Sequence, residues 1–168
     1  MRPAFSALAD VLGQIADVIG ALSDSEYAAP GPLGVSGSVG AHVRHCLDHV
    51  RALDQALVSR HIDYDARQRG HGIETDRRAA LTALDAARTR SLELDDRWLA
   101  GLVQVQTQIA GDGRTVVAHS TIGRELAFVI SHTIHHSATI SVLLHHHAGL
   151  ATPGGFGFAP STLCALSA

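Results

Sequence analysis

From Phe128 to Ile140 the chain reads Phe-Val-Ile-Ser-His-Thr-Ile-His-His-Ser-Ala-Thr-Ile, and this stretch decides the fold. Apolar residues recur here every three or four positions, which is the spacing of one face of an α-helix. His132 and His136 are four residues apart, so their side chains share that face at roughly 5–6 Å from each other. The pattern predicts a buried helix over about 121–148 that carries two inward-facing imidazoles.

Two imidazoles in a core need partners, because burying a polar group without one costs a few kcal/mol. One buried histidine is usually satisfied by a hydrogen bond from a neighbouring helix. A pair on one face is satisfied more simply by a metal ion, and neutral imidazole is a common ligand of zinc, nickel, copper and iron. We therefore interpret His132 and His136 as two ligands of a metal site.

A second histidine cluster offers the third ligand. Residues 38–49 read Ser-Val-Gly-Ala-His-Val-Arg-His-Cys-Leu-Asp-His, with Ser38 as the expected N-cap of a helix over about 38–59. On a helical projection His42 and His49 lie nearer the apolar stripe, and His45 lies on its flank. The spacing alone leaves all three histidines as candidates.

The rest of the chain predicts two more helices, over about 3–24 and 76–100. The third helix has an expected buried stripe made of Leu81, Leu84, Leu92 and Trp98. Alternating apolar residues predict a β-hairpin over about 102–118, and the Gly/Pro-rich segment 153–160 is expected to pack against the bundle without forming a helix. The fold class is therefore mainly α, an up-down four-helix bundle with a small hairpin between the third and fourth helices, in one domain over 1–168.

Composition excludes several classes of protein. The 168 residues are 46% hydrophobic and 17% charged, with a net charge of −3, and there is no basic run of the kind that binds nucleic acid. Two cysteines, Cys46 and Cys164, are too few for a disulfide framework, which favours a reducing, cytoplasmic setting. The sequence contains no run of 18 consecutive apolar residues, so it predicts no membrane span.

Four helices, an early histidine in the second and an H-x-x-x-H in the last resemble the DinB superfamily, which includes the YfiT-type metal hydrolases. The second-helix pattern of that family is matched here by Ser38, Val39, His45 and Asp48. On this register the resemblance implies a metal triad of His45, His132 and His136, holding one divalent ion, zinc or nickel. Members often continue as His-His-Arg-Gly-Gln, whereas this chain has Ser-Ala-Thr after its two histidines.

The resemblance also implies a function. Relatives include transferases and isomerases that use a low-molecular-weight thiol, and others that are regarded as hydrolases. We expect a metal-dependent enzyme with a small-molecule substrate, in which the metal activates such a thiol. Hydrolysis by a metal-activated water and a non-catalytic metal-binding module are the alternatives. Related bundles commonly form homodimers, and the apolar Gly/Phe tail favours one here.

Three further residues or groups are candidates near the site. Glu125 is seven residues before His132 on the same helical face, so it is a candidate general base or outer partner of an imidazole. Asp48 is a candidate partner of His45, although an exposed carboxylate paired with a neighbouring arginine explains it somewhat better. The loop with Tyr64, Arg67 and Arg69 is a candidate binding segment for an anionic substrate, although a salt-bridged surface connection explains it better.

Overall fold

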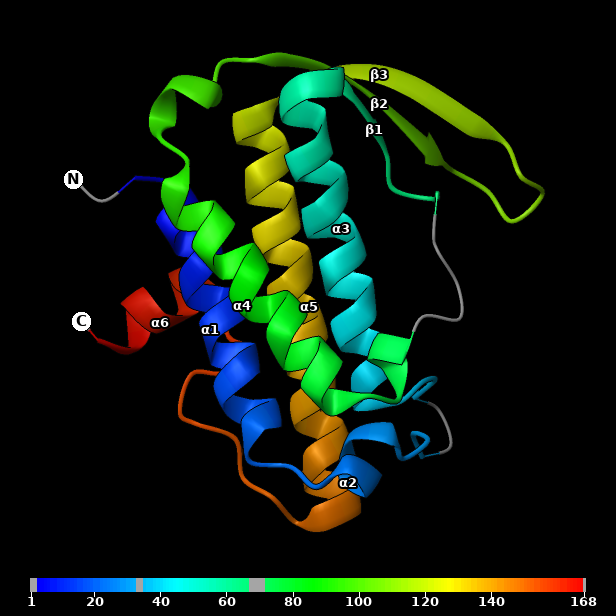
Figure 1. Cartoon of the computed structure of the whole chain (residues 1–168), viewed down its shortest axis with the longest axis vertical. Helices are drawn as coiled ribbons and strands as arrows, with labels where there is room; N and C mark the ends of the chain where they lie inside the picture. The colour runs from blue at the N-terminus through cyan, green and yellow to red at the C-terminus, as the bar shows by residue number, and fades with distance from the viewer. Residues whose placement is uncertain (1–2, 33–34, 67–71, 168) are drawn as a thin grey trace.

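The computed structural model describes residues 3–32, 35–66 and 72–167, and four long helices form its core (Figure 1). These helices are α1 (Phe5–Gly20), α3 (Val39–Ser59), α4 (Arg77–Glu93) and α5 (Ile122–Ala148). Shorter helical segments are α2 (Asp24–Ala28), η1 (Gly72–Glu74), η2 (Asp96–Trp98) and α6 (Pro160–Leu166). The predicted mainly helical four-helix bundle is confirmed.

The direction of the helices differs from simple alternation. Figure 1 shows α1 and α5 running one way and α3 and α4 running the other way. The chain after α3 returns along the bundle before α4 starts, so these two helices are parallel neighbours. Each is followed at the same end of the bundle by a strand, and those two strands pair in parallel, which requires such a return connection.

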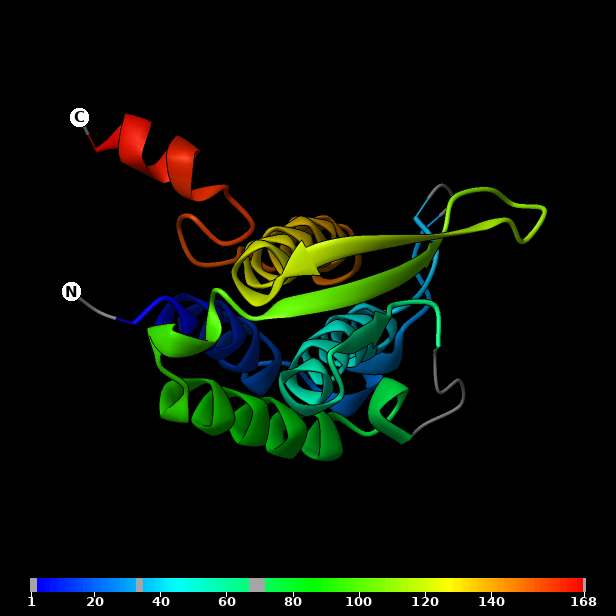
Figure 2. The same ribbon diagram turned by 90° about the horizontal axis from the view of Figure 1, so that it is seen from above.

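A three-stranded sheet crosses the end of the bundle where α3 ends and α5 begins (Figure 2). The expected hairpin is present as β2 (Leu102–Gln108) and β3 (Thr115–Thr121), and β1 (His61–Asp63) adds a parallel third strand beside β2. The sequence did not reveal β1, because three residues are too few to show alternation. The hairpin also starts α5, since the Oγ1 of Thr121 accepts a hydrogen bond from the Arg124 N–H at 3.2 Å.

Capping side chains set where the helices begin. The Ser38 hydroxyl accepts a hydrogen bond from the Ala41 N–H at 3.1 Å, so the predicted N-cap of α3 is present. Two expected helices are shorter than their patterns suggested. The segment expected as one helix over 3–24 is divided, because Ser23 and Glu26 form a capping box that begins α2. The helix expected over 76–100 ends at Glu93 and is followed by η2.

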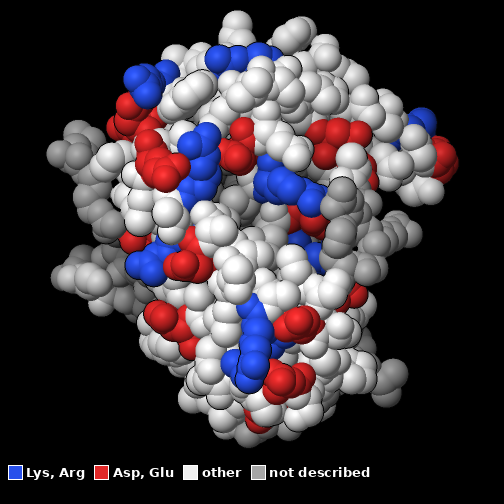
Figure 3. All heavy atoms as spheres, in the orientation of Figure 1, with Lys and Arg blue, Asp and Glu red and all other residues white. Residues whose placement is uncertain are grey.

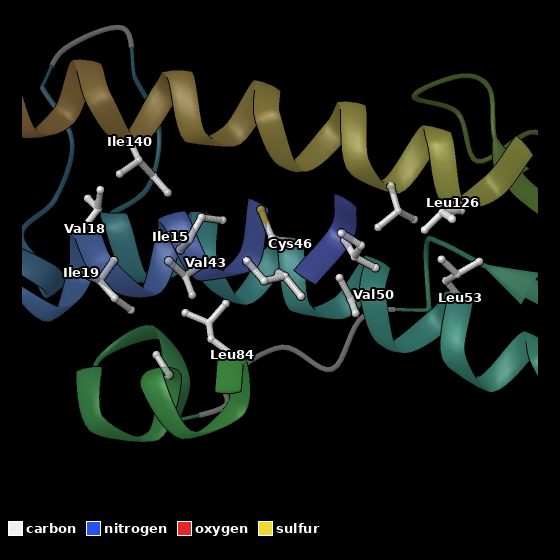
Figure 4. Close-up of a cluster of buried hydrophobic side chains, with 14 of the residues drawn as sticks. Ile15, Val18, Ile19, Val43, Cys46, Val50, Leu53, Leu84, Leu126 and Ile140 are labelled. Atoms are coloured by element: carbon white, nitrogen blue, oxygen red, sulfur yellow. The ribbon is translucent and has the colours of Figure 1, made fainter. Parts of the chain in front are cut away.

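The core is a single apolar cluster shared by the four long helices (Figure 4). Cys46 is fully buried within it, and burial raises the pKa of its thiol to about 12. The thiol is therefore protonated at neutral pH and packs as a small apolar group. Leu84 is buried as expected, but Leu92 is 55% exposed, which corrects its place in the expected stripe of the third helix.

The tail packs on the bundle through its aromatic part and then forms a helix that the sequence interpretation missed. Phe156 is buried against the core, and a side chain on Gly157 would meet the backbone of Ala138 on α5. Helix α6 begins at Pro160, which favours a first helical turn because its φ is already helical and it needs no N–H partner there. The expectation that the tail is non-helical holds only up to this proline.

Length and composition alone make the stretch Ile122–His146 able to cross a membrane. In the structure this stretch is most of α5, which packs against α1 and α3 in the bundle, and 33% of its most apolar 18-residue window is buried. A long apolar helix of a bundle core passes the same test as a membrane span.

Gly40 allows the start of α3 to approach η1 closely. A Cβ at this position would overlap the carbonyl oxygen of Glu74 and lie 2.7 Å from the Tyr27 ring. We expect Gly40→Ala to lower the free energy of unfolding by about 2–3 kcal/mol, since both neighbours are packed and one is backbone. The control is Gly20→Ala, where a Cβ has nothing within 4 Å and helix propensity favours alanine. Urea unfolding followed by circular dichroism compares them, and an equal effect of both substitutions contradicts the packing argument.

Candidate metal centre

The site lies between α3 and α5, two antiparallel helices that pack side by side. The first half of α3 carries His42, His45 and His49, and the middle of α5 carries His132 and His136. Their helical spacing brings the five rings together, with neighbouring ring centroids 4.3–5.0 Å apart. The structure thus brings the two histidine clusters of the sequence into one place.

Three of these histidines aim one nitrogen each at a common point. The Nε2 of His132 lies 2.9 Å from the Nε2 of His45 and 3.2 Å from the Nε2 of His136. The ligand atoms of the three residues all lie within 4.8 Å of one another. These are the three residues that the family resemblance selected as ligands.

The arrangement fits a metal ion better than it fits hydrogen bonds. A ring nitrogen has either one hydrogen or one lone pair, so the Nε2 of His132 can make a good hydrogen bond with only one of its two nitrogen neighbours. Three lone pairs pointing at one cation satisfy all three nitrogens. At zinc–nitrogen bonds of about 2.0–2.1 Å, tetrahedral ligand atoms are about 3.3 Å apart. The Nε2 of His132 lies 2.9 and 3.2 Å from the other two Nε2 atoms, close to this separation.

The protonation state of His136 also suits a metal ligand. Burial, and after it the neighbouring His132 and His42, lower the pKa of His136 to about 3. Its imidazole is therefore neutral at physiological pH, as a metal ligand must be.

His42 and His49, the two other candidates for the third ligand, make different contacts. The Nδ1 of His42 lies 2.8 Å from the Nδ1 of His136, on the side of that ring away from the triad. The buried His49 donates its Nδ1–H to the carbonyl oxygen of His45 at 3.0 Å. Both histidines therefore contact members of the triad and lie around it.

An aromatic wall that sequence reasoning did not predict lies beside the triad. The ring of Tyr64 stacks on His49 at 4.9 Å between centroids, and Phe128 stacks on His132 at 5.6 Å. Phe128 and Tyr64 also contact each other, at 5.1 Å. Tyr64 was expected in a loop near one end of the second helix, and its contacts with the histidines were not predicted. Arg67 and Arg69 of that loop lie outside the described residues.

Glu125 is buried, with 1% of its surface exposed, and its carboxylate accepts three hydrogen bonds. The hydroxyl of Tyr64 donates at 2.9 Å, the hydroxyl of Ser120 at 2.6 Å and the Arg124 guanidinium at 3.0 Å. Burial and the adjacent carboxylate raise the pKa of Tyr64, so the phenol stays protonated and remains a donor. Glu125 therefore reaches the triad indirectly, through Tyr64 and the His49 ring.

Asp48 and the opposite side of α3 belong to a separate surface. The Asp48 carboxylate pairs with Arg44 at 2.6 Å and with Arg51 at 3.2 Å, which favours the ion-pair interpretation of this residue. An apolar cavity of about 410 Å³ opens there between α3 and α4, across α3 from the histidines. Figure 3 shows acidic and basic side chains next to each other on this face of the molecule.

Comparisons with known proteins agree with this architecture. The sequence profile of the DinB family matches residues 4–156. In fold, the chain is similar to YfiT from Bacillus subtilis, described as a probable metal-dependent hydrolase with an unusual four-helix bundle topology. The TM-score is 0.59 at 18% identity, and the match covers 85% of each chain.

A curated relative is similar to part of the chain. FK506-binding protein 5 of Rhizopus delemar is 35% identical over 107 residues, which are 61% of this chain. The match spans 26% of the length of that protein. The profile match covers nearly the whole bundle together with its histidines, and the chain belongs to the DinB family.

Proposed function

We propose that this chain is a metal-dependent enzyme whose divalent ion, zinc or nickel, is held by His45, His132 and His136. The observation that carries the proposal is the convergence of the three Nε2 atoms. Three neutral protein ligands leave a coordination position open, which is typical of catalytic rather than structural zinc sites. A divalent ion at this site would lower the pKa of a water or thiol bound to it.

The favoured reaction is thiol transfer or isomerisation with a low-molecular-weight thiol. A thiol bound at this site would release its proton to solvent, and its thiolate would then displace the leaving group of an electrophile without a separate protein base. The surroundings support this route, because the Glu125 carboxylate is engaged by three donors and the wall next to His132 is the apolar ring of Phe128. That wall shields the thiolate from water and suits an apolar electrophile.

The alternative is metal-assisted hydrolysis, favoured by the fold similarity to YfiT. In this reaction a general base accepts a proton from the attacking water, and Glu125 is the proposed base. The Tyr64 hydroxyl donates to this carboxylate and the Tyr64 ring stacks on His49, which links Glu125 to the histidines.

One assay separates these reactions. Zinc-loaded protein is incubated with 1-chloro-2,4-dinitrobenzene and bacillithiol, mycothiol or glutathione, and loss of thiol and formation of thioether are followed together. Hydrolysis of 4-nitrophenyl acetate without thiol is measured in parallel, with His132→Ala as the control in both assays. We expect turnover that depends on both thiol and His132. Turnover of the ester alone supports hydrolysis, and no turnover of either substrate by fully loaded protein favours a non-catalytic binding module.

A homodimer and a cytoplasmic location remain predictions. One observation favours self-association: β3 is an edge strand, and Val116 and Val117, which point to its two faces, are 42% and 50% exposed. Exposed edges with apolar residues are typical of strands that pair with another chain.

A further inference from the structure

The ring of His42 contacts the Nδ1 edge of the His136 ring, which is opposite the Nε2 that faces the triad. The two Nδ1 atoms are 2.8 Å apart, and the ring planes are tilted by 38°. This is hydrogen-bond distance, so one of the two nitrogens must carry the hydrogen.

The chemistry of the triad decides which nitrogen carries it. A metal ligand must present a lone pair, so a ligating Nε2 of His136 leaves the single ring hydrogen on its Nδ1. The Nδ1 of His42 is then the acceptor. A histidine ligand whose second nitrogen donates a hydrogen bond has a fixed tautomer, a fixed ring orientation and a more basic ligating atom.

The fold holds His42 where it can act as this acceptor. It lies in the first turn of α3, whose backbone begins with the Ser38 cap, and it comes one turn before His45. The cap satisfies a backbone N–H of this turn and so stabilises the start of the helix that carries His42.

We propose that His42 is a positioning residue for the metal site: it accepts the Nδ1–H of His136 and thereby strengthens metal binding without being a ligand. The inference rests on the proposed metal site of His45, His132 and His136. It also gives a role to a histidine that the sequence left as an alternative ligand.

The test compares three variants of the full chain. His42→Ala removes the acceptor, and His42→Asn keeps an oxygen acceptor near the position of Nδ1. His135→Ala is the matched control, since His135 is exposed on α5 and its ring is 5.3 Å from that of His136 without a hydrogen bond to it. Zinc affinity is measured by competition with a chromophoric chelator, and zinc content at saturation by mass spectrometry. Circular dichroism checks that each variant is folded.

We expect His42→Ala to bind one zinc per chain at saturation with an affinity about 10–100-fold weaker. His42→Asn should recover most of that loss, and His135→Ala should bind like the wild type. In ¹⁵N-labelled wild-type protein loaded with zinc, a coupling between the two Nδ1 atoms across the hydrogen bond should be visible, with the hydrogen on His136.

Other outcomes overturn the inference in different ways. Unchanged affinity in His42→Ala, with zinc bound by the wild type, removes the positioning role and leaves the metal site intact. Loss of stoichiometric binding in folded His42→Ala makes His42 a ligand instead. Absence of zinc and nickel binding by the wild type refutes the proposed function itself, and the inference with it.

Discussion

In His132→Ala, bound zinc is expected to fall from about one equivalent per chain to less than about a tenth, because this residue is central to the triad. Its Nε2 is the atom closest to both other ligand nitrogens. The variant loses one of three ligands and leaves only two, His45 on α3 and His136 on α5. Mass spectrometry of untagged protein, purified without chelator and reloaded with zinc, measures the change.

In His132→Ala the stability of the fold should no longer increase when zinc is added. A metal that binds only the folded chain stabilises it by about 2.7 kcal/mol at a free concentration of 100 times Kd. For a chain of this size that corresponds to a rise in Tm of roughly 5–10 °C in the wild type. We expect no such rise in His132→Ala.

Two controls make this result specific to the site. His135→Ala removes the exposed neighbouring imidazole, and a double variant of His145 and His146 removes exposed imidazoles at the end of α5, which are candidates for adventitious metal binding. Both should keep one equivalent of zinc. Retention of zinc by His132→Ala together with its loss from the double variant places the metal at the end of the helix and contradicts the bundle site.

The histidine site shows how far spacing alone leads. The pair His132 and His136 follows from a four-residue interval on an apolar helical stripe, a local signal that needs no tertiary structure. The third ligand depends on how α3 is rotated against α5, and that rotation is set by packing of the whole bundle. Spacing therefore left His42, His45 and His49 open, and only a family resemblance separated them.

The parts of the fold that were missed share a cause. β1 is three residues long, and its parallel pairing with β2 is a long-range contact that no local pattern encodes. The direction of α4 depends on the same return of the chain. The contacts of Tyr64 were missed for this reason too, since the chain that follows β1 brings it against His49 and Glu125.

Glu125→Leu is the substitution outside the triad with the largest expected effect on stability. It removes a buried acceptor from the hydroxyls of Tyr64 and Ser120 and from Arg124. Hydrogen bonds to a charged group contribute about 1.5–3 kcal/mol each, and donors left buried without an acceptor add to the cost. We expect a loss of about 3–4 kcal/mol in the free energy of unfolding, measured by urea denaturation of metal-free protein.

A double-mutant cycle apportions this effect. Tyr64→Phe removes one donor and keeps the ring that stacks on His49, so it should cost about 1 kcal/mol. Combined with Glu125→Gln, which keeps the shape of the carboxylate, it should show a coupling of about 1 kcal/mol or more between the two side chains. Additive losses contradict the direct Tyr64–Glu125 contact.

The cycle also distinguishes the two roles considered for Glu125. If the carboxylate mainly holds the Tyr64 ring against His49, folded Glu125→Gln should still bind one zinc per chain. Any loss of turnover in Glu125→Gln and in Tyr64→Phe should then follow the loss of stability in each variant. A general base for hydrolysis should lose ester turnover by about 10²–10⁴-fold in Glu125→Gln at unchanged zinc content. Because the amide keeps the packing and removes only the proton acceptor, a large loss of turnover in a stable, zinc-loaded variant assigns Glu125 to the chemistry, and retained turnover assigns it to the fold.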